Sequence, residues 1–230
     1  MHDDDYVNTR LRLAQGTLLA SLRTDPPPGV RLRTDAELQA SLEDTLRQHD
    51  FDDDLHVFGY GSLMWNPAMD VVRTSLARVH GWHRRFCLRL LFGRGTVEEP
   101  GAMLALDRGG ACQGLLFRIA AAKVRAESRL LWRREMLAGS YDARWVRADV
   151  DGSSIRALAF VVNRRQERYI GDQPIETVAR LIRTGKGSLG TSRAYFDCTV
   201  QALARLGIRD LGIERLRHAI LQADRHADTV

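Results

Sequence analysis

Cysteine is scarce in this sequence of 230 residues. Cys87, Cys112 and Cys198 form no C-x-x-C pair and are odd in number. Neither a disulfide framework nor a cysteine-based zinc site is therefore expected. We expect these residues to be small buried hydrophobes in a reducing compartment.

Long apolar runs are also missing. The chain starts with MHDDDYVNTR, which is acidic and polar where a secretory signal would need a basic segment followed by an apolar one. No later apolar run approaches the roughly 20 residues that a membrane-spanning helix needs. These observations predict a cytoplasmic protein with no membrane partner.

Several catalytic motifs are absent as well. His80 and His83 share a β-like stretch, but the sequence contains no H-E-x-x-H or comparable ligand arrangement. No serine or cysteine lies in a nucleophile-elbow motif. A G-x-G-x-x-G pattern at 185–190 follows a helix-like segment instead of a strand, so the dinucleotide-binding context is missing. We expect no metal and no cofactor.

Basic residues exceed acidic ones only modestly, with 34 lysines and arginines against 29 aspartates and glutamates, a net charge of +5. The arginines are scattered among acids and alternate with apolar residues, instead of forming one basic run. We therefore expect no nucleic-acid partner, although a non-catalytic module that binds through its cationic surface stays open as an alternative. The sequence does not indicate the oligomeric state.

Residues 1–54 are predicted to form an N-terminal helical extension. A triple proline at 26–28 interrupts it, and a helix then begins at Thr34, with Glu37 completing a capping box. Leucines recur every four positions in this helix and form a narrow apolar stripe for docking on the core, at Leu38, Leu42 and Leu46. The main domain is predicted to span residues 55–230.

The main domain has the pattern of an α+β fold. Short β-like segments come first, a helix is predicted at 122–138, and further β segments precede the helices of the last third of the chain. This order favours a compact, strongly curved sheet or barrel with flanking helices over an alternating βαβ fold. The β segments are predicted at 55–60, 71–76, 83–92, 101–107, 112–119, 145–150 and 155–163, and the later helices at 175–184, 192–206 and 213–223.

One candidate binding loop follows the first predicted strand, in the segment Phe58-Gly-Tyr-Gly-Ser-Leu-Met-Trp65. Gly59 and Gly61 permit close approach of a ligand to the backbone, and such a turn can point N–H groups at a carboxylate. Tyr60 and Ser62 add hydroxyl donors. A purely structural corner between strand and loop is the alternative.

A candidate catalytic carboxylate lies on the predicted helix 122–138. At about 100° per residue, Glu135 falls on one line with the apolar residues Val124 and Leu131. A carboxylate on that stripe must face a cavity or have a partner, because burying it unpaired is costly. A salt bridge to a nearby arginine is the alternative. Tyr141, just after the helix, is a second candidate, either for orienting a ligand or as a buried structural tyrosine.

Four motifs in this order resemble the ChaC-type γ-glutamylcyclotransferases: FGYGSLMW, WRREMLAGSY, RYIGDQP and GKGSLGTSRAYF. The resemblance extends from about residue 56 to 210 and implies a small barrel of the γ-glutamylcyclotransferase type with flanking helices. Met64 and Ser140 depart from the residues common in the family, isoleucine and glycine, and the N-terminal extension is not part of the minimal family domain.

The resemblance also implies an activity, the conversion of glutathione to 5-oxoproline and Cys-Gly. By motif position, Glu135 is the general acid and base, and Tyr141 closes the turn after it. The substrate loop consists of Gly59, Tyr60, Gly61, Ser62, Leu63 and Met64. A cyclotransferase for another γ-glutamyl amine or amino acid, using the same ring closure, is the enzymatic alternative.

Overall fold

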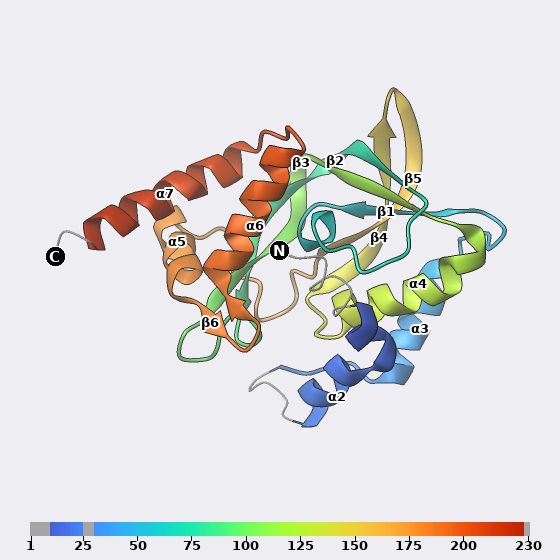
Figure 1. Ribbon diagram of the computed structural model, residues 1–230, viewed down its shortest axis with the longest axis horizontal. Coiled ribbons are helices and arrows are strands. Elements are labelled where there is room, and N and C mark those ends of the chain that lie inside the picture. Colours follow the sequence, from blue (N-terminus) through green and yellow to red (C-terminus); the bar gives the residue numbers. More distant parts are fainter. Residues whose placement is uncertain (1–9, 25–29, 228–230) are drawn as a thin grey trace. The chain divides into compact units, whose positions relative to one another are not determined.

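Five strands close into a barrel in the computed structural model, which describes residues 10–24 and 30–227 (Figure 1). Their order around the barrel is β1-β3-β2-β4-β5, and β1 closes it by pairing with β5 in parallel. The bounds of the strands are Leu55–Gly59 for β1, Arg73–Leu90 for β2, Gly101–Ile119 for β3, Tyr141–Val150 for β4 and Ser153–Val162 for β5. With its flanking helices, the barrel confirms the predicted α+β class.

The chain divides into two compact units. The first contains the residues up to His83 together with Arg108–Asn163, and the second contains Arg84–Asp107 together with Arg164–Val230. The long strands β2 and β3 contribute residues to both units. Every residue of the candidate site, from Gly59 to Tyr141, belongs to the first unit.

Strands β2 and β3 are longer than predicted. The sequence pattern suggested two short segments in each, with the D-R-G-G stretch as a turn, whereas each is one continuous strand. The reason is that Gly81, Gly109 and Gly110 adopt positive φ values of 78°, 103° and 69° inside the strands. Glycine tolerates this conformation, which bends a strand without ending it.

The core of the first unit is built largely from strand residues, with six consecutive buried residues at the end of β5. Val57, Leu158 and Ile119 are fully buried, and β1 pairs with β3 in antiparallel register from Leu55↔Ile119 to Gly59↔Leu115. Strands β4 and β5 form a hairpin whose two-residue turn has φ values of 47° at Asp151 and 82° at Gly152, as a type I′ turn requires.

Helices of the N-terminal extension lie in the first unit. Residues 10–15 are helical, α2 spans Thr17–Thr24, and α3 spans Asp35–Leu46. The predicted capping box is confirmed, since the Thr34 side chain accepts from the Glu37 backbone and Glu37 reaches back to Thr34. The predicted apolar stripe is also confirmed, with Leu38, Leu42 and Leu46 buried. The triple proline lies outside the described residues, and the division at residue 55 stays a prediction.

The helix predicted at 122–138 is confirmed, with a change of type near its end. It consists of a 3-10 turn, Ala121–Lys123, the α-helix α4, Val124–Leu131, and a π-helical turn, η3, Trp132–Met136. Gly139 follows with φ of +65°, a conformation that ends helices. Helix α4 lies beside α3 (Figure 1).

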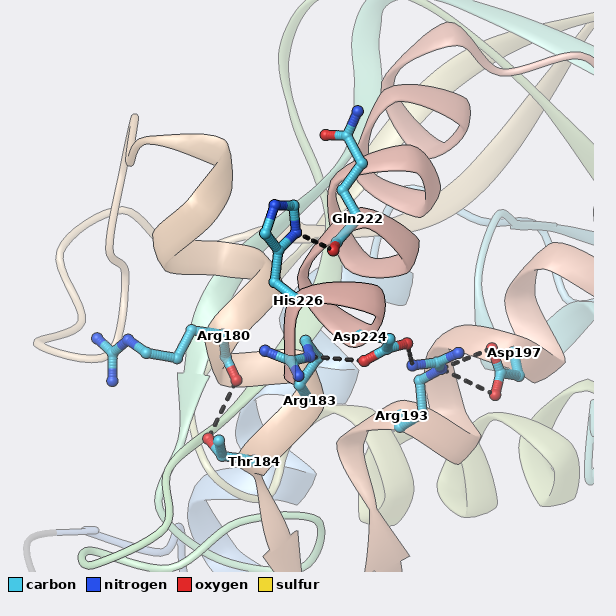
Figure 2. Close-up of polar contacts among 8 residues, drawn as sticks. All are labelled: Arg180, Arg183, Thr184, Arg193, Asp197, Gln222, Asp224 and His226. Carbon is cyan, nitrogen blue, oxygen red and sulfur yellow. Dashed lines mark hydrogen bonds and ion pairs between the residues drawn. The ribbon is translucent and has the colours of Figure 1, made fainter. Parts of the chain in front are cut away.

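The second unit contains the helices α5, Ile175–Thr184, α6, Ser192–Arg205, and α7, Leu211–Ala227, close to their predicted positions. The glycine-rich segment between α5 and α6 forms a two-stranded ladder, β6, Lys186–Gly187, and β7, Gly190–Thr191. Figure 2 shows an ion-pair network on these helices: Asp224 of α7 accepts hydrogen bonds from Arg183 of α5 at 2.7 Å and from Arg193 of α6 at 2.8 Å.

Among the residues that the structure describes, no helix combines the length and the apolar character that crossing a membrane requires.

Candidate active site

Glu135 lies in the π-helical turn η3, on the inward side of the first unit. Its side chain is 13% exposed, and the apolar residues that precede it on the same stripe, Val124 and Leu131, are buried almost completely. Because these residues of the same helical stripe are buried, the Glu135 side chain also faces the interior. Single π-helical turns occur often at functional sites, because the wider turn re-aims the side chains it carries.

The neighbouring Arg134 links Glu135 to the glycine-containing loop. Its Nε lies 2.9 Å from Glu135 Oε1, and its Nη2 donates a hydrogen bond of 3.0 Å to Ser62 Oγ. Its Nη1 donates to the carbonyl oxygen of Asn66, just after the loop. The guanidinium is only 14% exposed, so these contacts are partly shielded from water. Through this side chain, the structure brings Glu135 and Ser62 into one cluster.

The loop itself begins where β1 ends. Gly59 has no room for a side chain, since a Cβ there would lie 2.6 Å from the Phe117 ring and 3.0 Å from Leu63. A 3-10 turn, η1, Ser62–Met64, follows, and Met64 N donates to Gly61 O at 2.8 Å. The N–H groups of Trp65 and Asn66 both donate to Ser62 O. An anion that binds this loop must therefore use N–H groups that precede Met64.

Tyr60 and Leu63 are buried, and Met64 is half-buried. The Tyr60 hydroxyl donates a hydrogen bond of 2.6 Å to the carbonyl oxygen of Phe160 on β5, and its ring stacks near Phe58. The structure thus gives Tyr60 a role in fixing the loop against the barrel. Because its one hydroxyl proton is donated to Phe160 O, the hydroxyl is not the donor to a ligand that was expected, and the ring and backbone of Tyr60 stay the predicted binding groups.

Tyr141 is the first residue of β4 and is buried. It pairs with Val162, and the turn before it is held by Asn163, whose backbone N donates to Ser140 O at 2.9 Å. The Asn163 side chain also donates to Gly139 O, at 3.3 Å. These hydrogen bonds hold the turn between Glu135 and Tyr141 in place, although position 140 is serine where glycine is common in the family.

Burial raises the pKa of the Glu135 carboxyl above that of an ordinary glutamate, and the charge of Arg134 opposes this rise. Arg134 Nε lies 2.9 Å from Oε1, so this carboxylate oxygen has an ion-pair partner in the neighbouring guanidinium. Buried polar atoms are almost always satisfied. A buried carboxyl whose pKa is raised by burial beside a specific charged partner is a candidate for a group that exchanges protons with a ligand.

Two features of this region, the contacts of Arg134 with the loop and the burial of Glu127, were not predicted from the sequence. The salt bridge of Glu135 with a nearby arginine, the alternative interpretation from sequence, is present at Arg134, but the contacts of Arg134 with Ser62 and Asn66 were not predicted. Glu127 was not considered at all, yet it is 3% exposed and receives two hydrogen bonds of 2.6 Å from Arg10. Because both oxygens of Glu127 are bound, we assign this carboxylate a structural role.

The family model described as ChaC-like protein matches residues 55–223. This chain belongs to the ChaC-like family. The glutathione-specific γ-glutamylcyclotransferase of Escherichia coli is 40% identical over 178 residues, which are 77% of this chain and 77% of that protein. The rat protein named glutathione-specific γ-glutamylcyclotransferase 1 is 30% identical and aligns with 76% of this ChaC-like chain and 78% of its own length.

Solved structures support the fold of this family member. The crystal structure of a γ-glutamyl cyclotransferase specific to glutathione from yeast has a TM-score of 0.68 and 18% sequence identity. The superposition covers 74% of this chain and 96% of the yeast chain. The predicted γ-glutamylcyclotransferase-like fold is thereby confirmed.

Proposed function

We propose that the protein is a glutathione-specific γ-glutamylcyclotransferase that releases 5-oxoproline and Cys-Gly. The observation that carries the proposal is the largely buried Glu135 carboxyl, which is ion-paired with Arg134 and joined through it to the loop that begins at Gly59. The relatives that bear this activity in their names support the choice of substrate.

The substrate brings its own nucleophile. The α-amine of the glutamyl residue attacks its γ-carbonyl carbon, closes a five-membered ring and displaces the cysteinyl nitrogen. A C–N bond forms in the ring and the γ-amide C–N bond breaks, so no covalent intermediate with the protein is needed. Holding the folded substrate in this geometry is the proximity contribution of the site.

Glu135 moves the proton in this scheme. It takes a proton from the α-ammonium, which is charged at neutral pH, and gives one to the departing amine of Cys-Gly. A pKa raised by burial makes the carboxyl a better acid while the carboxylate stays available as a base. Positioned proton transfer of this kind contributes roughly 10²- to 10⁴-fold to the rate.

The loop from Gly59 to Met64 is proposed to bind the substrate. Backbone N–H groups before Met64 would hold a substrate carboxylate or the oxyanion that develops on the γ-carbonyl. Arg134 holds the loop in register with Glu135 through Ser62 Oγ. Tyr141, at the end of the glycine turn, is proposed to line the same site.

Replacing Glu135 by glutamine tests the proposal. Glutamine has nearly the same volume but cannot accept and return a proton, so we expect a folded protein whose turnover falls by about 10²-fold or more. The measurement is 5-oxoproline and Cys-Gly release from reduced glutathione by mass spectrometry, with circular dichroism to check folding. Glu176→Gln, on α5, is the control and should keep full activity. Undiminished product release by Glu135→Gln would reject the assignment.

The same assay decides between substrates. Parallel reactions with γ-glutamyl-alanine and γ-glutamyl-lysine derivatives would give kcat/KM values to compare with that for glutathione. The proposed specificity requires the glutathione value to be the highest. A higher value for another γ-glutamyl compound would leave the ring-closing chemistry in place and replace the substrate.

We also propose the cytoplasm as the location of the protein. Cys87, Cys112 and Cys198 are free thiols, which a reducing compartment preserves. Burial raises the pKa of the Cys87 thiol to about 12, so it stays protonated and inert.

A further inference from the structure

The N-terminal extension contacts the helical turn that carries Glu135. The family match begins only at residue 55, so the extension lies outside it. Of its 54 residues the structure describes 10–24 and 30–54. The contacts of these residues with η3 all fall within the first unit of the chain.

Arg33 binds the end of the turn that carries Glu135. Its backbone N donates to Leu137 O at 2.8 Å, and its side-chain Nη1 donates to Met136 O at 3.2 Å. The last carbonyl groups of a helix lack partners within the helix, and a cation there also interacts favourably with the helix dipole. Arg33 therefore donates to both carbonyl groups that directly follow Glu135, and at Met136 it adds a second hydrogen bond to the one from Gly139 N at 3.2 Å.

The extension also binds the start of the same turn. Arg133 Nη1 donates to Leu13 O at 3.1 Å and to Ala14 O at 3.3 Å. Trp132 Nε1 donates to Ser41 Oγ on α3 at 3.3 Å. Residues of η3 on both sides of Glu135 are thus attached to the extension, and Arg134 is left to contact the loop at Ser62.

The backbone at Arg33 is fixed by contacts with both neighbouring helices, α2 and α3. It directly precedes Thr34, the N-cap of α3, so the capping box fixes the chain at that point. Arg23 of α2 donates to Arg33 O at 3.4 Å and pairs with Asp35 at 2.9 Å. Two helices of the extension therefore fix the backbone at Arg33, from which its side chain reaches Met136 O.

We infer that the N-terminal extension contributes to the active site. Arg33 acts as a positioning residue, which holds η3 in place and thereby orients the Glu135 carboxyl. This role rests on the proposed function. A π-helical turn interrupts the regular i→i+4 hydrogen-bond pattern of an α-helix and is found frequently at functional sites. A shift of the carboxyl by about 1 Å can cost up to 10²-fold in rate.

The experiment compares three variants of the full-length chain. Arg33→Met removes the side-chain bond to Met136 and keeps the backbone bond to Leu137, so we expect kcat for glutathione to fall about tenfold with KM nearly unchanged. Arg33→Lys keeps a cationic donor and should recover most of the loss. Arg47→Met is the matched control, since Arg47 is an exposed arginine of the same extension that pairs with Asp44, and it should keep the parent's kcat.

Amide hydrogen exchange gives a second readout that does not depend on activity. In Arg33→Met the amides of residues 132–139 should exchange about tenfold faster, while the barrel strands keep their protection. Unchanged kcat, unchanged exchange in this segment, or faster exchange everywhere would each overturn the inference. If the parent fails to cleave glutathione, the proposed function fails, and the exchange comparison still decides whether Arg33 holds this turn.

Discussion

Arg134 makes three contacts with a single guanidinium, one with the Glu135 carboxyl and two with the loop. The contact with Glu135 bears on the pKa of that carboxyl, and the contacts with Ser62 and Asn66 hold the loop. A planar guanidinium with several donors in fixed directions suits this arrangement better than an ammonium group would. The residue therefore connects proton transfer with substrate binding.

Replacing Arg134 by methionine should move the pH profile of the reaction. Burial raises the pKa of Glu135 and the Arg134 charge lowers it, so removing that charge should raise the pKa further. If Glu135 must be ionised to accept the first proton, kcat/KM falls as pH drops through this pKa. We expect the acid limb of the profile to move to higher pH in the variant, as measured with glutathione across pH 5 to 9 at constant ionic strength.

Arg134→Lys is the matched control for this shift. It retains a positive charge beside Glu135 while losing the fixed fork that reaches Ser62 and Asn66, so its acid limb should lie closer to that of the parent. Its kcat should still fall, because the loop is no longer held. An acid limb that stays in place in Arg134→Met would show that this charge does not govern the titrating group.

Among the secondary-structure elements, the three helices of the second unit are joined by ion pairs at Asp224. This carboxylate bridges Arg183 of α5 and Arg193 of α6, and Arg193 also contacts Asp197 within α6 (Figure 2). Hydrogen bonds from Arg193 and Arg183 lower the pKa of Asp224. The network ties α7 to two other helices at one point.

Asp224→Asn should therefore destabilise the protein by about 1 kcal/mol at pH 7, the upper end for pairs that water partly screens. The stabilisation exists above the ordinary aspartate pKa and is lost as pH falls through the lowered folded-state pKa, so the difference between parent and variant should shrink in acid. Urea unfolding at pH 7 and pH 3 measures it. Asp197→Asn, which removes a single pair within α6, should cost less, and equal losses in both variants would contradict the bridging role.

Sequence patterns predicted the helices of this protein better than its strands. Thr34 and Glu37 begin α3 as expected, because a capping box is a local interaction between residues three positions apart. The lengths of β2 and β3 were not predicted, because the D-R-G-G stretch at Gly109 was interpreted as a turn and the segments of β2 on either side of Gly81 were predicted as separate strands. Strand pairing over the length of the barrel decides that such a glycine bends a strand instead of ending it.

On the scale of the whole molecule, the excess of positive charge is small and some of the described arginines are paired with acids. Arg84 pairs with Asp210 at 2.6 Å, and Arg164 pairs with Asp107 at the same distance. Neutralised arginines bind fewer phosphates, and phosphate contacts supply most non-specific affinity for nucleic acid. Ion pairs of this kind reduce the charge that a nucleic acid could use, and the absence of a nucleic-acid partner stays a prediction.

A direct binding measurement tests this interpretation. Fluorescence polarisation with a labelled single-stranded RNA, at about 150 mM salt, should show no saturable binding. Saturable binding that weakens steeply as salt is raised, together with no cyclotransferase activity, would favour the binding module. The same titration at low salt controls for weak electrostatic attraction.

The sequence by itself determined the α+β class, the helix that carries Glu135, the glycine-containing loop and the resemblance to a family, since these depend on periodicity, caps and short motifs. Tertiary structure alone decided that Arg134 joins Glu135 to Ser62, 72 residues away from Arg134, and that Arg33 binds the carbonyl of Met136, 103 residues away. The physical reason is that local patterns specify elements and the faces they bury. Which side chains then meet is set by the packing of those elements, and no short-range pattern contains that information.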